Sequence, residues 1–350
     1  MKQTGENMKK LKMIYKWILI SVILQTAVLA YLNYVYLPNR GQFRTTMYEV
    51  DMPSVKNRSI KLPEGASDIT VSYDGLYVAY RLGRRLEVVD IDSKKTIKKI
   101  EPTGGEFTYF GWLPDREMLI YSEKEPEGKS GCVRISTYDI VPELDRSYPD
   151  IKKLPEGSGV IDIELSPLTN IVYPKIKTSD TRARIYKFDI MDNLKLIFKT
   201  DLTTIIKETM YTDNLIYQPA GERICIRNGK TGKVTYVPVK EADLLLDVDD
   251  RDYIYAAATD ESGKVTAVYY GKAGAKADQW EEISLTQPVL PDDIIITAEG
   301  KVFAADRKQR TIKCYKGGYS SIDYDGELVT VLDSYVVTTD KNKLELKAMK

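Results

Sequence analysis

Catalytic chemistry in proteins most often uses histidine, and this sequence of 350 residues contains none. Without an imidazole, the chain cannot build a Ser-His-Asp or Cys-His catalytic group or a zinc site with histidine ligands. The string EGSGV (156–160) lacks the GxSxG pattern of a nucleophile elbow. No catalytic residue is therefore predicted, and the sequence favours a protein that is not an enzyme.

Tyrosine and carboxylate chemistry is the alternative that the composition leaves open. Some glycosidases use a tyrosine nucleophile together with carboxylates, and this chain has 25 tyrosines. Most of these tyrosines end short apolar runs, where they are typical packing residues of β-strands. The tyrosines alone therefore do not identify an active site.

Metal and cofactor sites are not predicted. The acidic stretch DVDDRD (247–252) invites a calcium-loop interpretation, which would need an oxygen donor fifth, glycine sixth and glutamate twelfth. Arg251, Asp252 and Ala258 occupy those positions, so a charged turn between strands is the favoured alternative. The string GKTGK (229–233) lacks the spacing of a phosphate-binding loop.

Basic residues in the longer polar segments are candidates for binding an anionic group of a partner. The 51 basic and 51 acidic residues cancel, so no overall field attracts nucleic acid, and no nucleic-acid partner is expected. Hydrated loop charges without a partner are the alternative for each candidate. Trp280, a single aromatic on a long loop, is a further contact candidate. The basic candidates are Arg84, Arg85, Lys175, Arg182 and Arg307.

Strands must position these residues, because one strand pattern recurs along residues 69–350. A polar turn precedes a short apolar run, as in Asp74-Gly75 before LYVAY. Seven such runs, ending between Tyr80 and Val337, have a mean spacing of about 43 residues, within the ~40–50 residues of a propeller blade. Another apolar run precedes each turn, as expected for a covered inner strand. The pattern predicts an all-β, seven-bladed β-propeller, with six or eight blades as alternatives.

Three segments also resemble a known repeat. SYDGLYVAY (72–80), WLPDREMLIY (112–121) and SPLTNIVY (166–173) are similar to the SPDGKxIAY repeat of TolB-like, WD40-like (PD40) β-propellers. The resemblance implies the propeller fold and leaves the activity open, because propellers serve binding, scaffolding and catalysis. In propellers the second-to-third-strand loops share a face with the blade-to-blade loops, and the basic candidates are expected on that face.

The seventh repeat is one strand short, since only KLELKAM (343–349) follows its second strand. The missing strand is expected from the N-terminal side, where TTMYEVDM (45–52) and SIKL (59–62) precede the first blade. Strands from both ends would close the ring and remove an exposed sheet edge. The propeller is accordingly expected to span residues 44–350, after a short linker at 38–43.

The N-terminal part contains an uncharged run of 21 residues, 17–37. As a helix it would be roughly 31 Å long, about the thickness of the hydrocarbon core of a bilayer. Trp17 stands at one end and tyrosines stand at the other, as is typical of membrane interfaces, and Pro38 ends the run. The run predicts one transmembrane helix. A cleavable signal peptide ending at Ala30 is the alternative.

Flanking charge predicts the orientation. Residues 1–16 carry five lysines and one glutamate. Because positive flanks stay inside, they are expected to form a cytoplasmic tail, with the propeller outside the cell or in the periplasm. The signal-peptide alternative would export the propeller as well.

Together these features predict a membrane-anchored, extracytoplasmic β-propeller that acts as a non-enzymatic platform for a protein or peptide of the cell envelope. The expected partners are the membrane, through residues 17–37, and an unidentified protein or peptide; no cofactor is expected. The alternative is an extracytoplasmic ligand sensor or histidine-free hydrolase with a carboxylate and tyrosine site at the channel mouth. A deep, carboxylate-lined channel with a shifted pKa would favour this alternative, and a broad shallow face would favour the platform.

Overall fold

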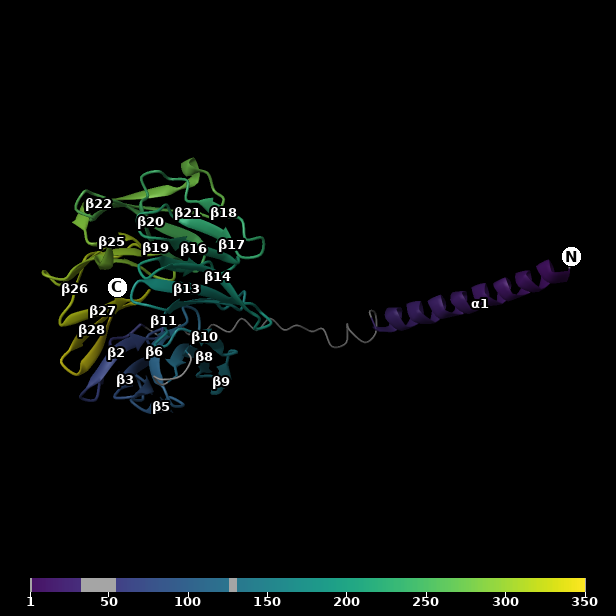
Figure 1. Ribbon diagram of the computed structural model, residues 1–350, viewed down its shortest axis with the longest axis horizontal. Helices are drawn as coiled ribbons and strands as arrows, with labels where there is room; N and C mark the ends of the chain where they lie inside the picture. The colour runs from purple at the N-terminus through teal and green to yellow at the C-terminus, as the bar shows by residue number, and fades with distance from the viewer. Residues whose placement is uncertain (1, 33–54, 126–130, 350) are drawn as a thin grey trace. The chain divides into compact units, whose positions relative to one another are not determined.

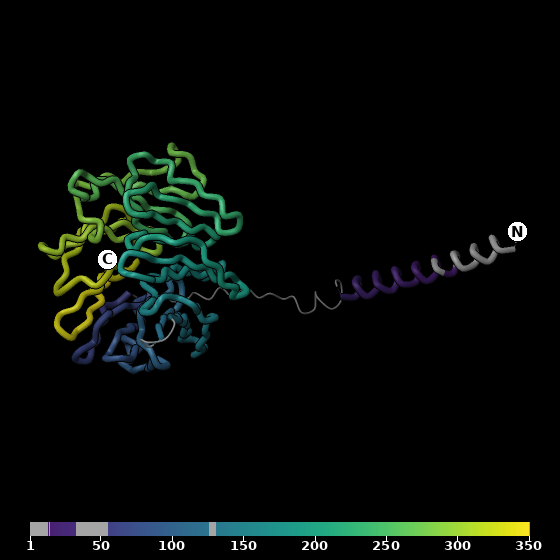
Figure 2. Tube along the Cα trace, in the orientation of Figure 1, coloured from purple at the N-terminus to yellow at the C-terminus, as the bar shows by residue number. Residues whose placement is uncertain are grey.

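The computed structural model describes residues 2–32, 55–125 and 131–349 (Figures 1 and 2). In the N-terminal helix, side chains are described at residue 13 and from residue 15 onward. The chain divides into two units, Met1–Ser54 and Val55–Lys350.

The described residues of the first unit form the helix α1 (Lys2–Tyr31). Its described apolar side chains, among them Trp17 and Leu24, are exposed. Within the part of the chain that the structure describes, no helix combines the length and the apolarity needed to cross a bilayer. The end of the predicted run beyond residue 32, the linker 38–43 and the segment 45–52 lie outside the described residues.

The described residues of the second unit form seven antiparallel sheets (Figure 1), which confirms the predicted seven-bladed, all-β propeller. Blade 1 consists of β2 (Ala66–Val71), β3 (Tyr77–Leu82), β4 (Arg85–Asp90) and β5 (Thr96–Ile100). Blade 2 consists of β6 (Glu106–Trp112), β7 (Met118–Lys124), β8 (Gly131–Asp139), β9 (Leu144–Ser147) and β10 (Ile151–Leu154). Blade 3 consists of β11 (Gly159–Ser166), β12 (Ile171–Lys177), β13 (Arg182–Phe188) and β14 (Leu194–Asp201).

The remaining blades follow the same order, from an inner first strand to an outer fourth strand. Blade 4 consists of β15 (Ile205–Glu208), β16 (Asn214–Gln218), β17 (Cys225–Asn228) and β18 (Val234–Tyr236). Blade 5 consists of β19 (Leu244–Val248), β20 (Tyr253–Thr259), β21 (Val265–Lys272) and β22 (Glu281–Val289), with η2 (Ala277–Gln279) before β22. Blade 6 consists of β23 (Ile294–Ile296), β24 (Val302–Asp306), β25 (Thr311–Lys316) and β26 (Ile322–Asp323), preceded by η3 (Pro291–Asp293).

Blade 7 combines strands from both ends of the propeller. Its C-terminal strands are β27 (Glu327–Val331), β28 (Tyr335–Asp340) and β29 (Lys343–Ala348), and β1 (Arg58–Lys61) pairs with β29. The buried Arg58 side chain lies in this blade, where its guanidinium donates hydrogen bonds to the Tyr335 hydroxyl and, over 3.2 Å, to Asp92. β1 thus supplies the outer strand that the last repeat lacks.

The hydrophobic core is divided among the spaces between neighbouring blades. The described residues form seven clusters of buried side chains, and each cluster joins residues of two successive blades. The cluster between blades 7 and 1, for example, contains Val337 and Leu346 together with Val71 and Val78. Because apolar burial is continuous around the ring, each blade is stabilised by both of its neighbours.

The inner strands carry a recurrent irregularity. In blades 1, 2, 3, 5 and 7 the pairing of the first strand with the second shifts near the start of the first strand. Such a bulge increases twist and redirects the side chains that follow it. In β11 and β19 the shift immediately precedes Asp162 and Asp247, respectively. These two carboxylates belong to the charged site described next.

Candidate functional site

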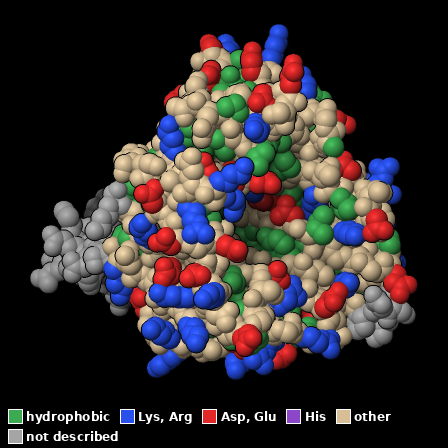
Figure 3. Space-filling view, turned by 90° about the vertical axis from the view of Figure 1, so that its left-hand side faces the viewer, with side chains coloured by type: hydrophobic (Ala, Val, Ile, Leu, Met, Phe, Trp, Pro, Cys, Tyr) green, Lys and Arg blue, Asp and Glu red, His purple; other side chains and the backbone are tan. Residues whose placement is uncertain are grey.

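A pocket of about 290 Å³ lies where the inner strands end. Its walls come mainly from β6, β11, β15, β19 and β23 and from the turns that follow them. Figure 3 shows a hollow near the centre of the face that it draws, with acidic and hydrophobic side chains inside. The lining of the pocket is likewise mixed. Its polar members include Tyr109, Glu164, Lys207, Glu208, Asp247 and Asp250.

One lysine links two of the carboxylates across neighbouring blades. The Lys207 Nζ of β15 lies 3.3 Å from Glu164 Oε1 of β11 and 3.2 Å from Asp247 Oδ1 of β19. Burial lowers the pKa of Lys207, but the charges of Asp247, Glu164 and Asp162 outweigh it and raise this pKa well above its usual value. Lys207 is therefore held as an ammonium ion between three blades.

The carboxylates around Lys207 exceed the charge that it can neutralise. Burial raises the pKa of Glu164 to about 8; Lys207 opposes this shift, while Asp162 and Asp247 add to it. Burial also raises the pKa of Asp162, which Lys207 and Lys175 oppose. The pocket thus combines repelling carboxyl groups in a desolvated setting, an arrangement that is common at functional sites.

Glu208 is the most isolated of these groups. Its side chain is buried, and the residue is 8% exposed. Its Oε1 lies 3.5 Å from the Thr169 hydroxyl, whereas its Oε2 has no hydrogen-bond partner among the described residues. Burial, Glu164 and Asp213 raise the pKa of Glu208 well above its usual value. Lys187 and a hydrogen bond from the Ser166 backbone oppose this shift. A buried carboxyl oxygen without a partner costs free energy, and Glu208 Oε2 is in this position.

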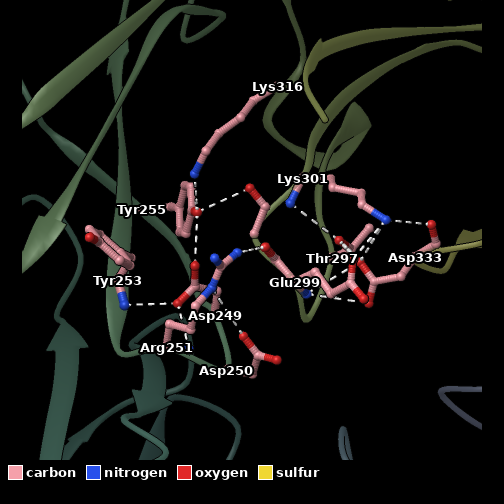
Figure 4. Close-up of polar contacts among 11 residues, drawn as sticks. Asp249, Asp250, Arg251, Tyr253, Tyr255, Thr297, Glu299, Lys301, Lys316 and Asp333 are labelled. Atoms are coloured by element: carbon pink, nitrogen blue, oxygen red, sulfur yellow. Dashed lines mark hydrogen bonds and ion pairs between the residues drawn. The ribbon is translucent and has the colours of Figure 1, made fainter. Parts of the chain in front are cut away.

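Other acidic residues at the same end of the blades have structural partners. In the DVDDRD segment, Asp249 accepts hydrogen bonds from the backbone of Arg251 and Tyr253, each at 2.9 Å, and from the Tyr255 hydroxyl at 3.0 Å (Figure 4). The Lys316 ammonium of blade 6 donates in turn to the Tyr255 hydroxyl at 2.9 Å. These contacts are those of the charged turn that the sequence favoured.

A similar set of contacts to an acidic side chain joins blades 6 and 7. The Thr297 hydroxyl and the Glu299 backbone donate to Asp333, and Lys301 lies 2.8 Å from Glu299 Oε2 (Figure 4). In the part of the chain that the structure describes, no cluster of three or more cysteine, aspartate or glutamate side chains is arranged to hold a metal ion. The acidic turns therefore join blades, and the turn after β19 also brings Asp249 and Asp250 to the pocket wall.

The predicted basic candidates lie at the other end of the strands, in or beside second-to-third-strand turns. The exposed Arg84 donates to the Gly105 carbonyl over 2.9 Å, and Arg85 pairs with Glu87 at 2.7 Å. Arg182 is exposed at the start of β13. Arg84 and Arg85 belong to blade 1 and Arg182 belongs to blade 3, and no contact in the described structure joins the two blades through these side chains. That they bind an anionic group stays a prediction.

The other two basic candidates, Lys175 and Arg307, each have a polar partner within the propeller. Lys175 is buried and donates to the carbonyls of Leu202, at 2.8 Å, and Thr204, at 2.5 Å. Burial lowers the pKa of Lys175, and nearby carboxylates oppose this shift. Arg307 pairs with Asp293 of its own blade at 2.6 Å. Lys175 is therefore a link between blades 3 and 4.

The expectation of an exposed contact at Trp280 is wrong. The indole is buried, with 8% exposure, in the cluster between blades 4 and 5. Its ring lies over Gly271, where a Cβ atom would come within 2.5 Å of it. The segment before β22 places the Trp280 indole in the core between blades 4 and 5, so Trp280 is a packing residue.

The pocket residues themselves were not selected from the sequence. Glu164 and Glu208 lie within the runs VIDIEL and IKETMY, which were assigned to inner strands on their apolar residues. The signal was nevertheless present, because a charged side chain in a strand covered on both sides needs a partner or a function. Charge in an inner strand is thus the feature that points to this pocket.

Comparison with known proteins supports the fold alone. No family model and no curated protein matches the sequence. Among solved structures, the chain is similar to the β-propeller domain of Cps50 (Swd1) from Myceliophteria thermophila, with 11% identity, a TM-score of 0.53, and coverage of 84% of this chain and 100% of that one. A chain of a mitotic checkpoint complex gives 10% identity, a TM-score of 0.50, and coverage of 87% and 98%.

The chain spans less than half of one enzyme that it resembles. Dipeptidyl peptidase 4 of Porphyromonas gingivalis matches with 11% identity and a TM-score of 0.47, over 72% of this chain and 44% of that one. The similarity to the Cps50 domain shows a β-propeller fold. Membership of the TolB-like family stays a prediction, since no family model matches.

Proposed function

We propose that this protein is a membrane-anchored, extracytoplasmic binding platform that takes a protein or peptide partner at the pocket end of its propeller. The pocket in the inner strands carries the proposal, because its carboxylates outnumber the lysine that they surround. A ring of blades gives a rigid support on which such a site is preorganised. The neighbour found in a mitotic checkpoint complex illustrates a propeller that works within a protein assembly.

The membrane anchor rests on the sequence of the N-terminal unit. The uncharged run 17–37 has the length of a membrane span, and five lysines precede it. The exposed apolar side chains of α1 are of the kind that lipid covers. Protease treatment of intact cells or, for a periplasmic propeller, of spheroplasts should remove the propeller and leave a protected N-terminal fragment. Digestion of the propeller only after lysis would contradict the outward orientation.

The pocket also has features that the enzymatic alternative expected, namely a carboxylate-lined channel and a raised pKa at Glu164. Two-carboxylate hydrolysis needs an acid and a second carboxylate free to act as base or nucleophile. Here the Lys207 ammonium contacts both Glu164 and Asp247, which leaves these carboxylates engaged. The contacts of Lys207 therefore leave neither Glu164 nor Asp247 free for the second role, which favours binding over hydrolysis at these two groups.

A selection experiment tests the binding function. Peptides would be selected from a random display library on the full-length protein in lipid nanodiscs, and their affinities measured for two variants. Ala298→Trp narrows the pocket without changing its charge. Lys308→Trp places the same bulk on an exposed turn of the same blade, at the opposite end.

We expect Ala298→Trp to weaken the binding of the selected peptides by about tenfold or more, and Lys308→Trp to leave their affinity unchanged. The reverse pattern, with loss only in Lys308→Trp, would place the partner on the second-to-third-strand turns and overturn the proposed function.

A further inference from the structure

The chemistry of the pocket indicates what it binds. Glu164, Glu208, Asp247 and Asp250 line it, and Lys207 is its one basic side chain. We propose that the pocket binds an alkyl ammonium group, carried by a lysine side chain or by a free alkylamine, with Oε2 of the Glu208 carboxylate as the anchoring ligand. This inference rests on the proposed function and names its ligand class.

Glu208 is the observation that distinguishes this pocket from an ordinary acidic surface. Its Oε2 is buried and has no hydrogen-bond partner among the described residues, although the neighbouring Lys207 is already held by Glu164 and Asp247. Asp250 Oδ1 also accepts no hydrogen bond, and it lies 3.7 Å from Arg251 Nε. A cation that enters the pocket would provide the missing partner for Glu208.

The apolar part of the lining favours an ammonium on a hydrocarbon stem. Trp112, Leu113, Ile163, Met210 and Ile296 stand beside the carboxylates. Lysine and simple alkylamines combine an apolar stem with a compact charged head, so both parts find matching surface. The volume of about 290 Å³ lies at the lower end of the range for ligand pockets, which suits a single side chain.

The donor geometry favours ammonium over guanidinium. A guanidinium binds best to a carboxylate that offers both oxygens, and Glu208 has one oxygen free of partners. An ammonium is a point charge with three donors and needs no such planar match. Lys207 shows the arrangement within the protein itself, since its ammonium lies 3.2–3.3 Å from two carboxylates.

Proton release should accompany binding. Glu164 and Asp213 face Glu208 as like charges, Lys187 opposes them, and burial together with the carboxylates raises the pKa of Glu208. An arriving ammonium stabilises the ionised carboxylate, so Glu208 gives up its proton when the ligand binds. Binding is therefore expected to strengthen as pH rises, for as long as the alkylamine remains charged.

The test is calorimetric titration of the full-length protein in nanodiscs with n-butylammonium and with Nα-acetyl-lysine N-methylamide. Titrations in two buffers of different ionisation enthalpy would count released protons. Glu208→Gln keeps the shape and removes the charge. Glu261→Gln, in an exposed turn at the other end of blade 5, is the matched control.

We expect Glu208→Gln to lose about tenfold or more in affinity and to lose the proton release, while Glu261→Gln binds like the wild type. Thermal melting should show Glu208→Gln folded and at least as stable as the wild type, because the variant no longer buries an unpaired carboxylate. Equal binding by Glu208→Gln and the wild type would overturn the assignment.

The two ligands separate the sources of the ammonium group. Tighter binding of the lysine derivative points to a peptide partner, whereas tighter binding of butylammonium points to a free amine. If neither binds but the selected peptides still lose affinity in Ala298→Trp, the ammonium inference fails and the proposed function stands. Binding of Ca²⁺ or Mg²⁺ in place of both amines would also refute the inference.

Discussion

Glu164, Lys207 and Asp247 show how a charged site can be kept inside a propeller. Each comes from the inner strand of a different blade, and the Lys207 ammonium lies within 3.3 Å of both acids. Pairing reduces the penalty of burying these charges, but it does so only for the groups that are paired. Glu208 is left over, and its unpaired oxygen is the strongest sign of an external ligand.

The raised pKa of Glu164 makes stability depend on pH. Its folded-state pKa of about 8 lies above the ordinary value of 4.5. The folded protein therefore holds this proton more tightly than the unfolded chain does. The resulting stabilisation is complete below pH 4.5 and is lost as pH rises toward 8.

Glu164→Gln should accordingly have a melting temperature that falls less between pH 5 and pH 9 than that of the wild type. Circular dichroism melts at several pH values would measure the difference, with Glu261→Gln as the control that follows the wild type. Parallel curves for Glu164→Gln and the wild type would contradict the pKa assignment.

At the scale of elements, the repeat pattern predicted the blades because turns and strand ends use a limited chemistry. Asp74-Gly75 lies in the turn that leads into β3, and Gly75 has a φ of +71°, which a glycine adopts without strain. The strand SIKL, proposed to close the ring, overlaps β1. Local rules of this kind act within a few residues, so a sequence displays them directly.

The sites were less predictable because they depend on which strands become neighbours. Glu164 and Lys207 are 43 residues apart and meet only because blades 3 and 4 pack together. The sequence places Lys175 in a polar loop, whereas its side chain is buried against the carbonyls of Leu202 and Thr204. Contacts between repeats are therefore where inference from one sequence is weakest.

Trp280 gives an element-scale test of the core between blades 4 and 5. Its buried indole packs in that cluster and over Gly271, so Trp280→Ala should lower the free energy of unfolding by about 3–5 kcal/mol. Tyr211→Ala, at a side chain that is 65% exposed, should change it by about 0.5 kcal/mol or less. Denaturant titration measures both, and similar values for the two variants would contradict the core placement.

For the whole molecule, the two ends of the blades differ in character. At one end the inner strands close around a pocket with surplus carboxylates, and at the other end the second-to-third-strand turns carry Arg84, Arg182 and Arg307. The second strand of each blade runs from one end of the blade to the other, so the length of this strand separates the two surfaces. One small partner therefore cannot contact both surfaces. The proposed function therefore assigns the partner to the pocket end.

Hydrogen–deuterium exchange of the full-length protein, with and without a selected peptide, tests this assignment most directly. The account predicts slower exchange on binding at the inner-strand ends, in segments 162–166, 205–210 and 247–250. It predicts no change in the turns 82–85, 177–182 and 306–311. Protection confined to those turns, with the inner-strand ends unaffected, would contradict it.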